Sequence, residues 1–287
     1  MITSEVKTAE TVTPPIKWPG GKRWLMRRFP GVLRIDRRHR YFEPFLGGAA
    51  VFAHYRPPHA LLSDLNAELI GVYSAIRADP TGIVRKLGEH QKYHGREYYY
   101  RVRSITCQDP VDAAARFIYL NRTCFNGIYR VNQRGEFNVP IGSRNSVVFD
   151  SDDFVGWSRL LKHAEVRACD FEESIAVAGP GDFVFADPPY VVKHNLNGFR
   201  KYNEALFSWA DQERLARVLR DAAERGVRVV ATNANHPSVS LLYPRVFRRI
   251  PVTRGSSVAG SAANRGTTEE LILWTEGAVN ELVFWES

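Results

Sequence analysis

Short apolar runs alternate with amphipathic helical patterns over much of this chain. Six of these runs are bounded by turn residues and are predicted to be strands, at 40–43, 60–63, 165–168, 183–186, 227–231 and 270–274. Apolar residues recur with helical spacing up to about Phe29 and again at 211–225, and a helix of small residues is expected from Ala49. This alternation predicts an α/β protein with a doubly wound sheet.

The pattern changes in the middle of the chain. Here helices rich in aromatic residues and arginine, such as 113–122, are followed by a turn-rich stretch at 126–142. We interpret this part as an inserted, mainly helical domain. The predicted boundaries are 14–66 and 149–287 for the α/β domain, 67–148 for the insertion, and 1–13 for a polar tail that we expect to be flexible.

Composition indicates a globular protein with an anionic partner. The 287 residues are 44% hydrophobic and 24% charged, which suits one large α/β core with a smaller lobe. The formal net charge of +8 indicates nucleic acid or an anionic membrane surface as the partner. We see no signal peptide and no apolar run of about 18 residues, so we expect a cytosolic protein without a membrane span.

The cysteines and histidines form no pattern typical of metal binding. Cys107, Cys124 and Cys169 lack CxxC spacing, and no HExxH motif is present. We therefore expect neither a metal site nor a disulfide framework. None of the cysteines follows a proline, which argues against the nucleophile of a cytosine-C5 methyltransferase.

The candidate for chemistry is Asp187-Pro188-Pro189-Tyr190, directly after the predicted strand 183–186. The Asp187 carboxylate and the Pro188 carbonyl are hydrogen-bond acceptors, and the two prolines stiffen the backbone that carries them. Such acceptors localise the lone pair of an exocyclic amine on a nucleobase, and Tyr190 offers a ring on which a base can stack. A simple proline turn is the alternative, but ligand sites of open α/β sheets lie at the carboxyl ends of strands.

Two other strand ends suggest a nucleoside cofactor. Phe45-Leu46-Gly47-Gly48 follows the first strand, where glycines allow close approach of a ligand to the backbone. Asp64 ends the second strand, the position of acids that hold ribose hydroxyls. The loop from Lys17 to Lys22 adds an indole and two amines, but it lacks the GxxxxGK[ST] sequence of nucleotide hydrolases.

The stretch 121–140 suits nucleic acid. It interleaves arginines, aromatic residues and asparagines, and Glu136 is the only acid between Asn121 and Phe137. Arginine can form two hydrogen bonds to guanine, asparagine can pair with adenine or phosphate, and an aromatic side chain can enter a base stack. A solvated hairpin without function is the alternative.

In this order, these motifs resemble the Dam family of DNA adenine-N6 methyltransferases over most of the chain. The family motif KWxGGK is matched at 17–22, EPFxG at 43–47, DxN at 64–66 and DPPY at 187–190. The longest match is the family's target-recognition hairpin, at 120–140. The chain departs from the family at Ala49, where FxGxG has its second glycine, and at Phe125, where the family usually has tyrosine.

The resemblance implies a Rossmann-like, S-adenosylmethionine-dependent methyltransferase sheet with an inserted target-recognition domain that contains a β-hairpin. It implies transfer of a methyl group from S-adenosylmethionine to N6 of an adenine flipped out of duplex DNA, in GATC or a related site. The residues implied to carry the chemistry are Asp187, Pro188, Pro189 and Tyr190. Those implied to bind the cofactor are Trp18, Lys22, Phe45, Gly47, Asp64, Asp170, Phe171 and Asp187. Those implied to contact DNA are Lys17, Arg122, Phe125, Asn126, Ile128, Arg130, Asn132, Asn138 and Pro140.

Within this assignment Asp187 acts as an ionised acceptor, Phe125 fills the space that the flipped base leaves, and Arg130 reads a guanine. Three alternatives stay open: an RNA adenine-N6 methyltransferase, a DNA cytosine-N4 methyltransferase, and a catalytically silent DNA-binding module. The sequence leaves open the oligomeric state, the route of the amino proton, and whether the enzyme belongs to a restriction–modification pair.

Overall fold

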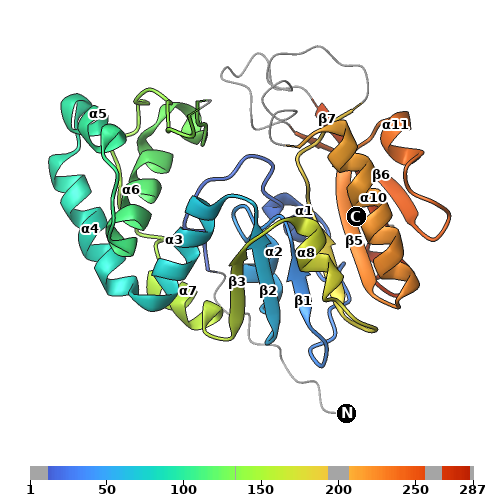
Figure 1. Cartoon of the computed structure of the whole chain (residues 1–287). Coiled ribbons are helices and arrows are strands. Elements are labelled where there is room, and N and C mark those ends of the chain that lie inside the picture. The colour runs from blue at the N-terminus through green and yellow to red at the C-terminus, as the bar shows by residue number, and fades with distance from the viewer. Residues whose placement is uncertain (1–11, 133, 193–206, 256–266, 285–287) are drawn as a thin grey trace. The chain divides into compact units, whose positions relative to one another are not determined.

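The computed structural model describes residues 12–132, 134–192, 207–255 and 267–284. Within these ranges, seven strands form one sheet in the order β3-β2-β1-β4-β5-β7-β6 (Figure 1). The first five strands in this order are parallel to one another, and β7 is antiparallel to both β5 and β6. The strand bounds are Tyr41–Glu43 (β1), Ala60–Asp64 (β2), Ala164–Ala168 (β3), Phe183–Ala186 (β4), Arg228–Ala234 (β5), Arg248–Gly255 (β6) and Thr267–Trp274 (β7).

The α/β prediction is confirmed, and each of the six predicted strands is present within a few residues of its expected bounds. The sequence pattern missed β6. Its residues Arg248 to Gly255 carry three arginines and Pro251, a composition more typical of a loop than of a strand. The strand forms at the edge of the sheet, where a proline without an N–H is tolerated.

Most helices begin at side chains that cap their free N–H groups. Asp79, Asp109 and Asp153 accept from backbone N–H groups at three helix starts. Ser208 and Asp211 form a capping box at the start of α10. The α-helix bounds are Arg23–Arg28 (α1), Ala50–Tyr55 (α2), Ala67–Ala78 (α3), Pro80–Tyr93 (α4), Arg96–Ser104 (α5), Pro110–Thr123 (α6), Phe154–Leu161 (α7), Phe171–Ala176 (α8), Trp209–Glu224 (α10) and Pro237–Ser240 (α11).

Chain contacts divide the protein into two compact units. The sheet unit consists of Trp24–Gly47, Pro57–Ile70 and His163–Ser287, and it contains all seven strands. The helical unit consists of Met1–Arg23, Gly48–Arg56 and Gly71–Lys162. In the helical unit α4 packs against α6 and α7, and α5 packs against α6. The helical unit thus holds most of the predicted insertion together with two earlier segments of the chain.

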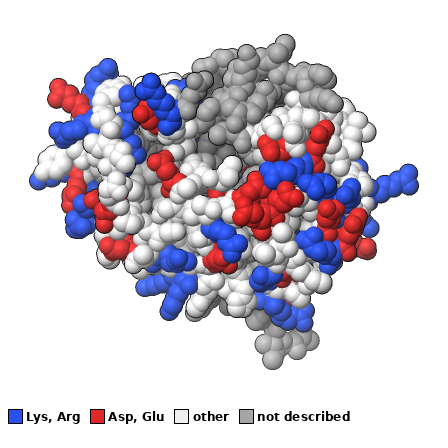
Figure 2. Space-filling model, in the orientation of Figure 1, with Lys and Arg blue, Asp and Glu red and all other residues white. Residues whose placement is uncertain are grey.

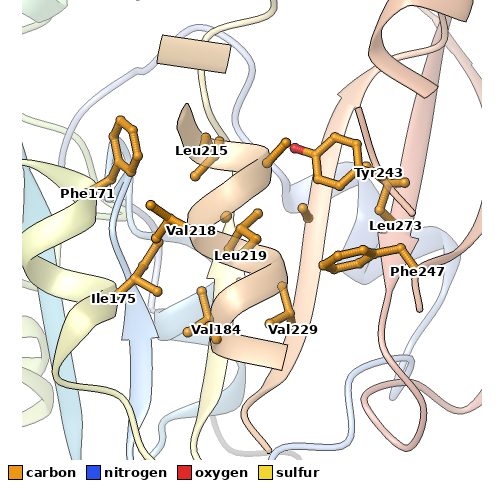
Figure 3. Packing of buried hydrophobic residues seen from close by; sticks show 14 of the residues in the cluster. Phe171, Ile175, Val184, Leu215, Val218, Leu219, Val229, Tyr243, Phe247 and Leu273 are labelled. Atoms are coloured by element: carbon orange, nitrogen blue, oxygen red, sulfur yellow. The ribbon is translucent and has the colours of Figure 1, made fainter. Parts of the chain in front are cut away.

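The core of the sheet unit lies between the sheet and the helices α8 and α10, which cover one of its faces (Figure 1). Val184 and Val229 lie beneath Leu219 of α10 (Figure 3). On either side are residues of α8 and residues from the C-terminal part of the unit, among them Phe171, Ile175, Tyr243, Phe247 and Leu273 (Figure 3). This packing fixes the strands whose carboxyl ends carry the predicted site residues.

Candidate active site

The DPPY segment leaves the sheet at the carboxyl end of β4. Asp187 is half-buried, and its Oδ1 accepts a hydrogen bond of 2.6 Å from the hydroxyl of Thr232. Thr232 lies on β5 and is completely buried. Pro188 is buried and Pro189 half-buried, so the turn that carries the carboxylate is held on both sides.

Tyr190 is fixed through its hydroxyl, which donates to Glu270 Oε2 at 2.8 Å. Glu270 lies on β7 and is completely buried. Burial of the Tyr190 hydroxyl, together with the charges of Asp187 and Glu270, raises its pKa well above the usual value. The hydroxyl therefore stays protonated and remains a donor, while the residue keeps part of its surface exposed.

The glycine turn after β1 meets the end of β2. The N–H of Gly47 donates to Asp64 Oδ2 at 3.1 Å, and the N–H of Asn66 donates to Oδ1 at 3.0 Å. Burial raises the pKa of the Asp64 carboxyl, against the effect of these N–H groups, which favour the charged form. The structure thus brings together Gly47 and Asp64, the two halves of the predicted nucleoside site.

The backbone near this turn takes an unusual course. Gly47 has a φ of 46°, and Ala49 has a φ of 52°, in the left-handed region that disfavours a side chain. Ala49 is the position at which the chain lacks the second glycine of FxGxG. The alanine thus adopts a conformation that glycine would adopt without steric cost.

Aromatic rings surround the third strand end. Phe45 stacks on Phe171 at 5.4 Å and meets Phe207 edge-on at 5.7 Å. Asp170 caps α8 and pairs with Arg214, whose guanidinium lowers the pKa of Asp170 and lies 4.1 Å from the centre of the Phe171 ring. The sheet unit therefore gathers Phe45, Asp170 and Phe171 beside each other.

The predicted residues of the helical unit form a second group. Trp18 stacks on Tyr129 at 5.7 Å between ring centres, and its Cβ is 3.5 Å from the Cβ position of Gly48. The side-chain amide of Asn121 makes two hydrogen bonds to the backbone of Lys17, at 2.9 and 2.8 Å. The loop that carries Trp18 and Lys22 is thereby tied to the start of the predicted recognition hairpin.

The hairpin itself is short and antiparallel. Val131 bridges Phe137, and the N–H of Asn138 donates to the carbonyl of Arg130 at 3.2 Å. Four of the predicted DNA contacts are exposed on it, namely Phe125, Asn126, Arg130 and Pro140. Ile128, Asn132 and Asn138 are half-buried. Lys17 donates from Nζ to the carbonyl of Asn126 at 2.6 Å.

Arg122 differs from the other predicted DNA contacts, because the protein itself surrounds its guanidinium. Both terminal nitrogens donate to Asp152 at 2.7 Å, and they also donate to the carbonyls of Val147 and Pro15. The side chain is 3% exposed. We therefore correct the assignment of Arg122 from DNA binding to a buried ion pair that joins α6 to two loops.

Two further observations concern the part of the chain that the structure describes. None of its helices is long and apolar enough to cross a membrane. Nor does it contain a group of three or more histidine, cysteine or acidic side chains placed to hold a metal ion.

Comparison with known proteins identifies the family. The model of the D12 class N6 adenine-specific DNA methyltransferases matches residues 18–257. The chain belongs to this family. It is 34% identical to the "Type II methyltransferase M1.LlaDCHI" of Lactococcus lactis subsp. cremoris, over 94% of this chain and 98% of that protein.

Two other proteins show how widely the likeness extends. The chain is 33% identical to the "Type II methyltransferase M.MjaIII" of Methanocaldococcus jannaschii, over 91% of this chain and 99% of that protein. It is 28% identical to the "DNA adenine methylase" of Escherichia coli, over 92% and 96% of the two chains. The resemblance seen in the motifs is confirmed, and the chain is an adenine-specific DNA methyltransferase.

The sequence analysis of this D12 methyltransferase overlooked two residues that contact the DPPY segment. Thr232 and Glu270 contact Asp187 and Tyr190, yet neither belongs to a motif that we recognised. A signal was present, because both are polar residues within runs predicted as strands or directly after them. Buried polar groups need hydrogen-bond partners, so such positions point to a neighbouring polar group.

Proposed function

We propose that this D12 methyltransferase binds S-adenosylmethionine at the carboxyl ends of β1, β2 and β4. The residues that we propose as contacts are Trp18, Lys22, Phe45, Gly47, Asp64, Asp170, Phe171 and Asp187. The side chains of the sheet unit fit this cofactor. The Asp64 carboxylate can accept hydrogen bonds from ribose hydroxyls, and the rings of Phe45 and Phe171 can pack against adenine. When bound, the cofactor supplies a methyl group already activated by its positive sulfur.

We further propose that Asp187 and the carbonyl of Pro188 accept the two hydrogens of the target N6 amine. This draws the nitrogen lone pair out of the ring and aims it at the methyl carbon. S-adenosylmethionine held by the residues named above would supply this methyl group and keep the electrons of its carbon–sulfur bond, and the methylated nitrogen would give up one proton to water. The observation that carries this proposal is the half-exposed carboxylate of Asp187, held by Thr232 at the end of β4.

The target adenine must leave the duplex before it can reach this corner. Extraction of a base from the stack costs a few kcal/mol, which stacking on Tyr190 offsets by about 1–3 kcal/mol. We propose that the helical unit is the target-recognition domain, with Phe125 filling the gap in the duplex. The exposed position of Phe125, at 54% of its surface, supports this role.

The recognition sequence is proposed to be GATC. Its support is the match of the stretch 120–140 to the family's recognition hairpin, with Arg130 as the guanine reader. Lys17, Ile128 and Pro140 are proposed to touch neighbouring bases, and Asn126, Asn132 and Asn138 to contact bases or phosphates. Methylome sequencing of DNA from cells that express the chain tests this, because it reports the base, the modified atom and the site together.

Replacement of Asp187 by alanine tests the catalytic assignment. We expect Asp187→Ala to abolish methyl transfer to duplex DNA, while the affinity for DNA stays close to that of the wild type. Asp182→Asn is the matched control, because Asp182 is the buried carboxylate before the other end of β4, where it binds Arg40. Asp182→Asn should lower the melting temperature and still methylate. Transfer by Asp187→Ala at the wild-type rate would disprove the assignment.

A further inference from the structure

We propose that Thr232 and Glu270 are positioning residues of the methyl-transfer site. Thr232 orients the Asp187 carboxylate, and Glu270 orients the ring of Tyr190. This inference rests on the proposed function of the DPPY segment, and it concerns two residues that lie outside every motif of the sequence analysis. All four side chains belong to the sheet unit.

The register of the sheet explains why Thr232 reaches Asp187. Ala186, the last residue of β4, is paired with Ala231 of β5, and the residues that follow them in the chain are Asp187 and Thr232. The threonine hydroxyl donates to Oδ1 across 2.6 Å. This bond fixes the plane of the carboxylate, and therefore the direction in which its oxygens accept hydrogens from a target amine.

The antiparallel strand β7 supplies the second contact. Glu270 is paired with Ala234, at the end of β5 nearest to the catalytic corner. Its carboxylate accepts from the Tyr190 hydroxyl at 2.8 Å. A hydroxyl held at the far end of a ring fixes the tilt of that ring, so β7 sets the plane on which the adenine is proposed to stack.

Burying polar side chains costs free energy unless they form hydrogen bonds. Thr232 and Glu270 are both fully buried, and a buried carboxylate is disfavoured unless it is hydrogen-bonded. Valine has nearly the same shape as threonine and would fill its position without a hydroxyl. Both positions nevertheless carry a polar side chain, and each side chain is hydrogen-bonded to the DPPY segment. We infer from this that the two side chains orient that segment and do not serve packing alone.

Residues that only orient reacting groups have a distinct kinetic effect. Their loss slows the chemical step and leaves the binding of DNA and cofactor nearly unchanged, because the contacts that bind both remain. A general loss of folding would instead lower the melting temperature and all activities together. The two possibilities are separable by single-turnover kinetics combined with binding measurements.

Variants of Thr232 give the first test. Thr232→Val keeps the shape and removes the hydroxyl, and we expect the single-turnover rate of methyl transfer to fall by roughly tenfold or more. Thr232→Ser keeps the hydroxyl and should restore a rate near that of the wild type. Thr275→Val is the matched control, because its buried hydroxyl accepts from the N–H of Val229 near the other end of β5. It should change stability but not the rate of transfer.

The second contact is tested by a double-mutant cycle. Tyr190→Phe keeps the ring and removes the donor, and we expect the transfer rate to fall by about tenfold. Glu270→Gln keeps an oxygen acceptor and should transfer faster than Tyr190→Phe. In the Glu270→Leu background, Tyr190→Phe should cause little further loss, because both changes remove the same bond. If Glu270→Leu does not fold, the transfer rates of Tyr190→Phe and Glu270→Gln still test the role of this contact.

Two results would overturn the inference. One is that Thr232→Val transfers methyl groups as fast as Thr275→Val. The other is that Tyr190→Phe transfers at the wild-type rate, or that Glu270→Gln transfers as slowly as Tyr190→Phe. Failure of the proposed function would look different, because the wild-type protein itself would then transfer no methyl group to adenine in duplex DNA.

Discussion

At the scale of single residues, burial separates two arginines that the sequence presents in the same way. Arg122 and Arg130 both lie in the stretch that resembles the family's hairpin. Arg122 is enclosed with Asp152, whereas Arg130 is exposed and donates from Nε to Asn138 at 2.9 Å. Of the two, only Arg130 presents its guanidinium on the surface. An exposed guanidinium can donate two hydrogen bonds to the O6 and N7 atoms of a guanine.

Replacement of Arg130 tests its assignment as the guanine reader. We expect Arg130→Ala to cost about 1–3 kcal/mol of discrimination at one base pair, because one bidentate base contact is lost. The rate of methylation on duplexes substituted at each position of the site measures this. Arg134→Ala, at an exposed position four residues further along the hairpin, is the control and should not alter the base preference. Equal weakening on all duplexes would make Arg130 a phosphate contact instead.

At the scale of elements, the helical unit is held together by polar aromatic contacts as well as by apolar packing. His90 on α4 stacks on Tyr119 of α6 at 4.6 Å, and its Nδ1 is hydrogen-bonded to the hydroxyl of Tyr98 on α5 at 2.8 Å. Burial lowers the pKa of His90 to about 4. The imidazole is therefore neutral in the folded protein at neutral pH.

The pH dependence of stability follows from His90. In the unfolded chain its pKa returns to about 6.5, so between that value and about 4 the unfolded state binds more protons. Stability is therefore lost as the pH falls through this window. We expect His90→Phe to lose less melting temperature than the wild type between about pH 7 and about pH 5. His163→Phe, at an exposed position, should follow the wild type; an unchanged slope in His90→Phe would contradict the role of His90.

At the scale of the whole molecule, the location of charge matters more than its sum. The chain carries a formal net charge of +8. Where α8 and α10 lie, acidic and basic side chains are mixed (Figure 2). Arg214 there pairs with Asp170, Glu172 and Asp211, and Arg220 pairs with Asp221 and lies near Glu224. Basic groups paired in this way have less to offer to the phosphates of DNA.

Two charge reversals of equal size test this view. Arg130→Glu and Arg220→Glu lower the net charge by the same amount, but we expect only Arg130→Glu to weaken duplex binding strongly. Dissociation constants of both variants for duplex DNA, measured at about 50 and about 200 mM salt, test this, because the carboxylate that Arg130→Glu places beside the DNA repels its phosphates and salt screens this repulsion. Equal losses in the two variants would mean that net charge alone governs binding.

Much of the fold was predictable because its signals are local. A few adjacent residues are enough to indicate a strand or a helix start. The apolar run 183–186 indicates β4, and the capping residues Ser208 and Asp211 indicate the start of α10. The strand β6 was not predictable, since Pro251 and the arginines oppose a strand locally and only pairing with β7 forms it. The burial of Arg122 was hidden for the same reason, because Asp152 lies 30 residues away.

The sequence by itself determined the family, the α/β class and the place of the DPPY segment after a strand, because each is written in contiguous residues whose order survives without coordinates. The tertiary structure decided which side chains hold that segment in place. Thr232 is 45 residues from Asp187, and Glu270 is 80 residues from Tyr190. Only the pairing of β4 with β5 and of β5 with β7 brings them together, and strand pairing depends on contacts that no local pattern contains.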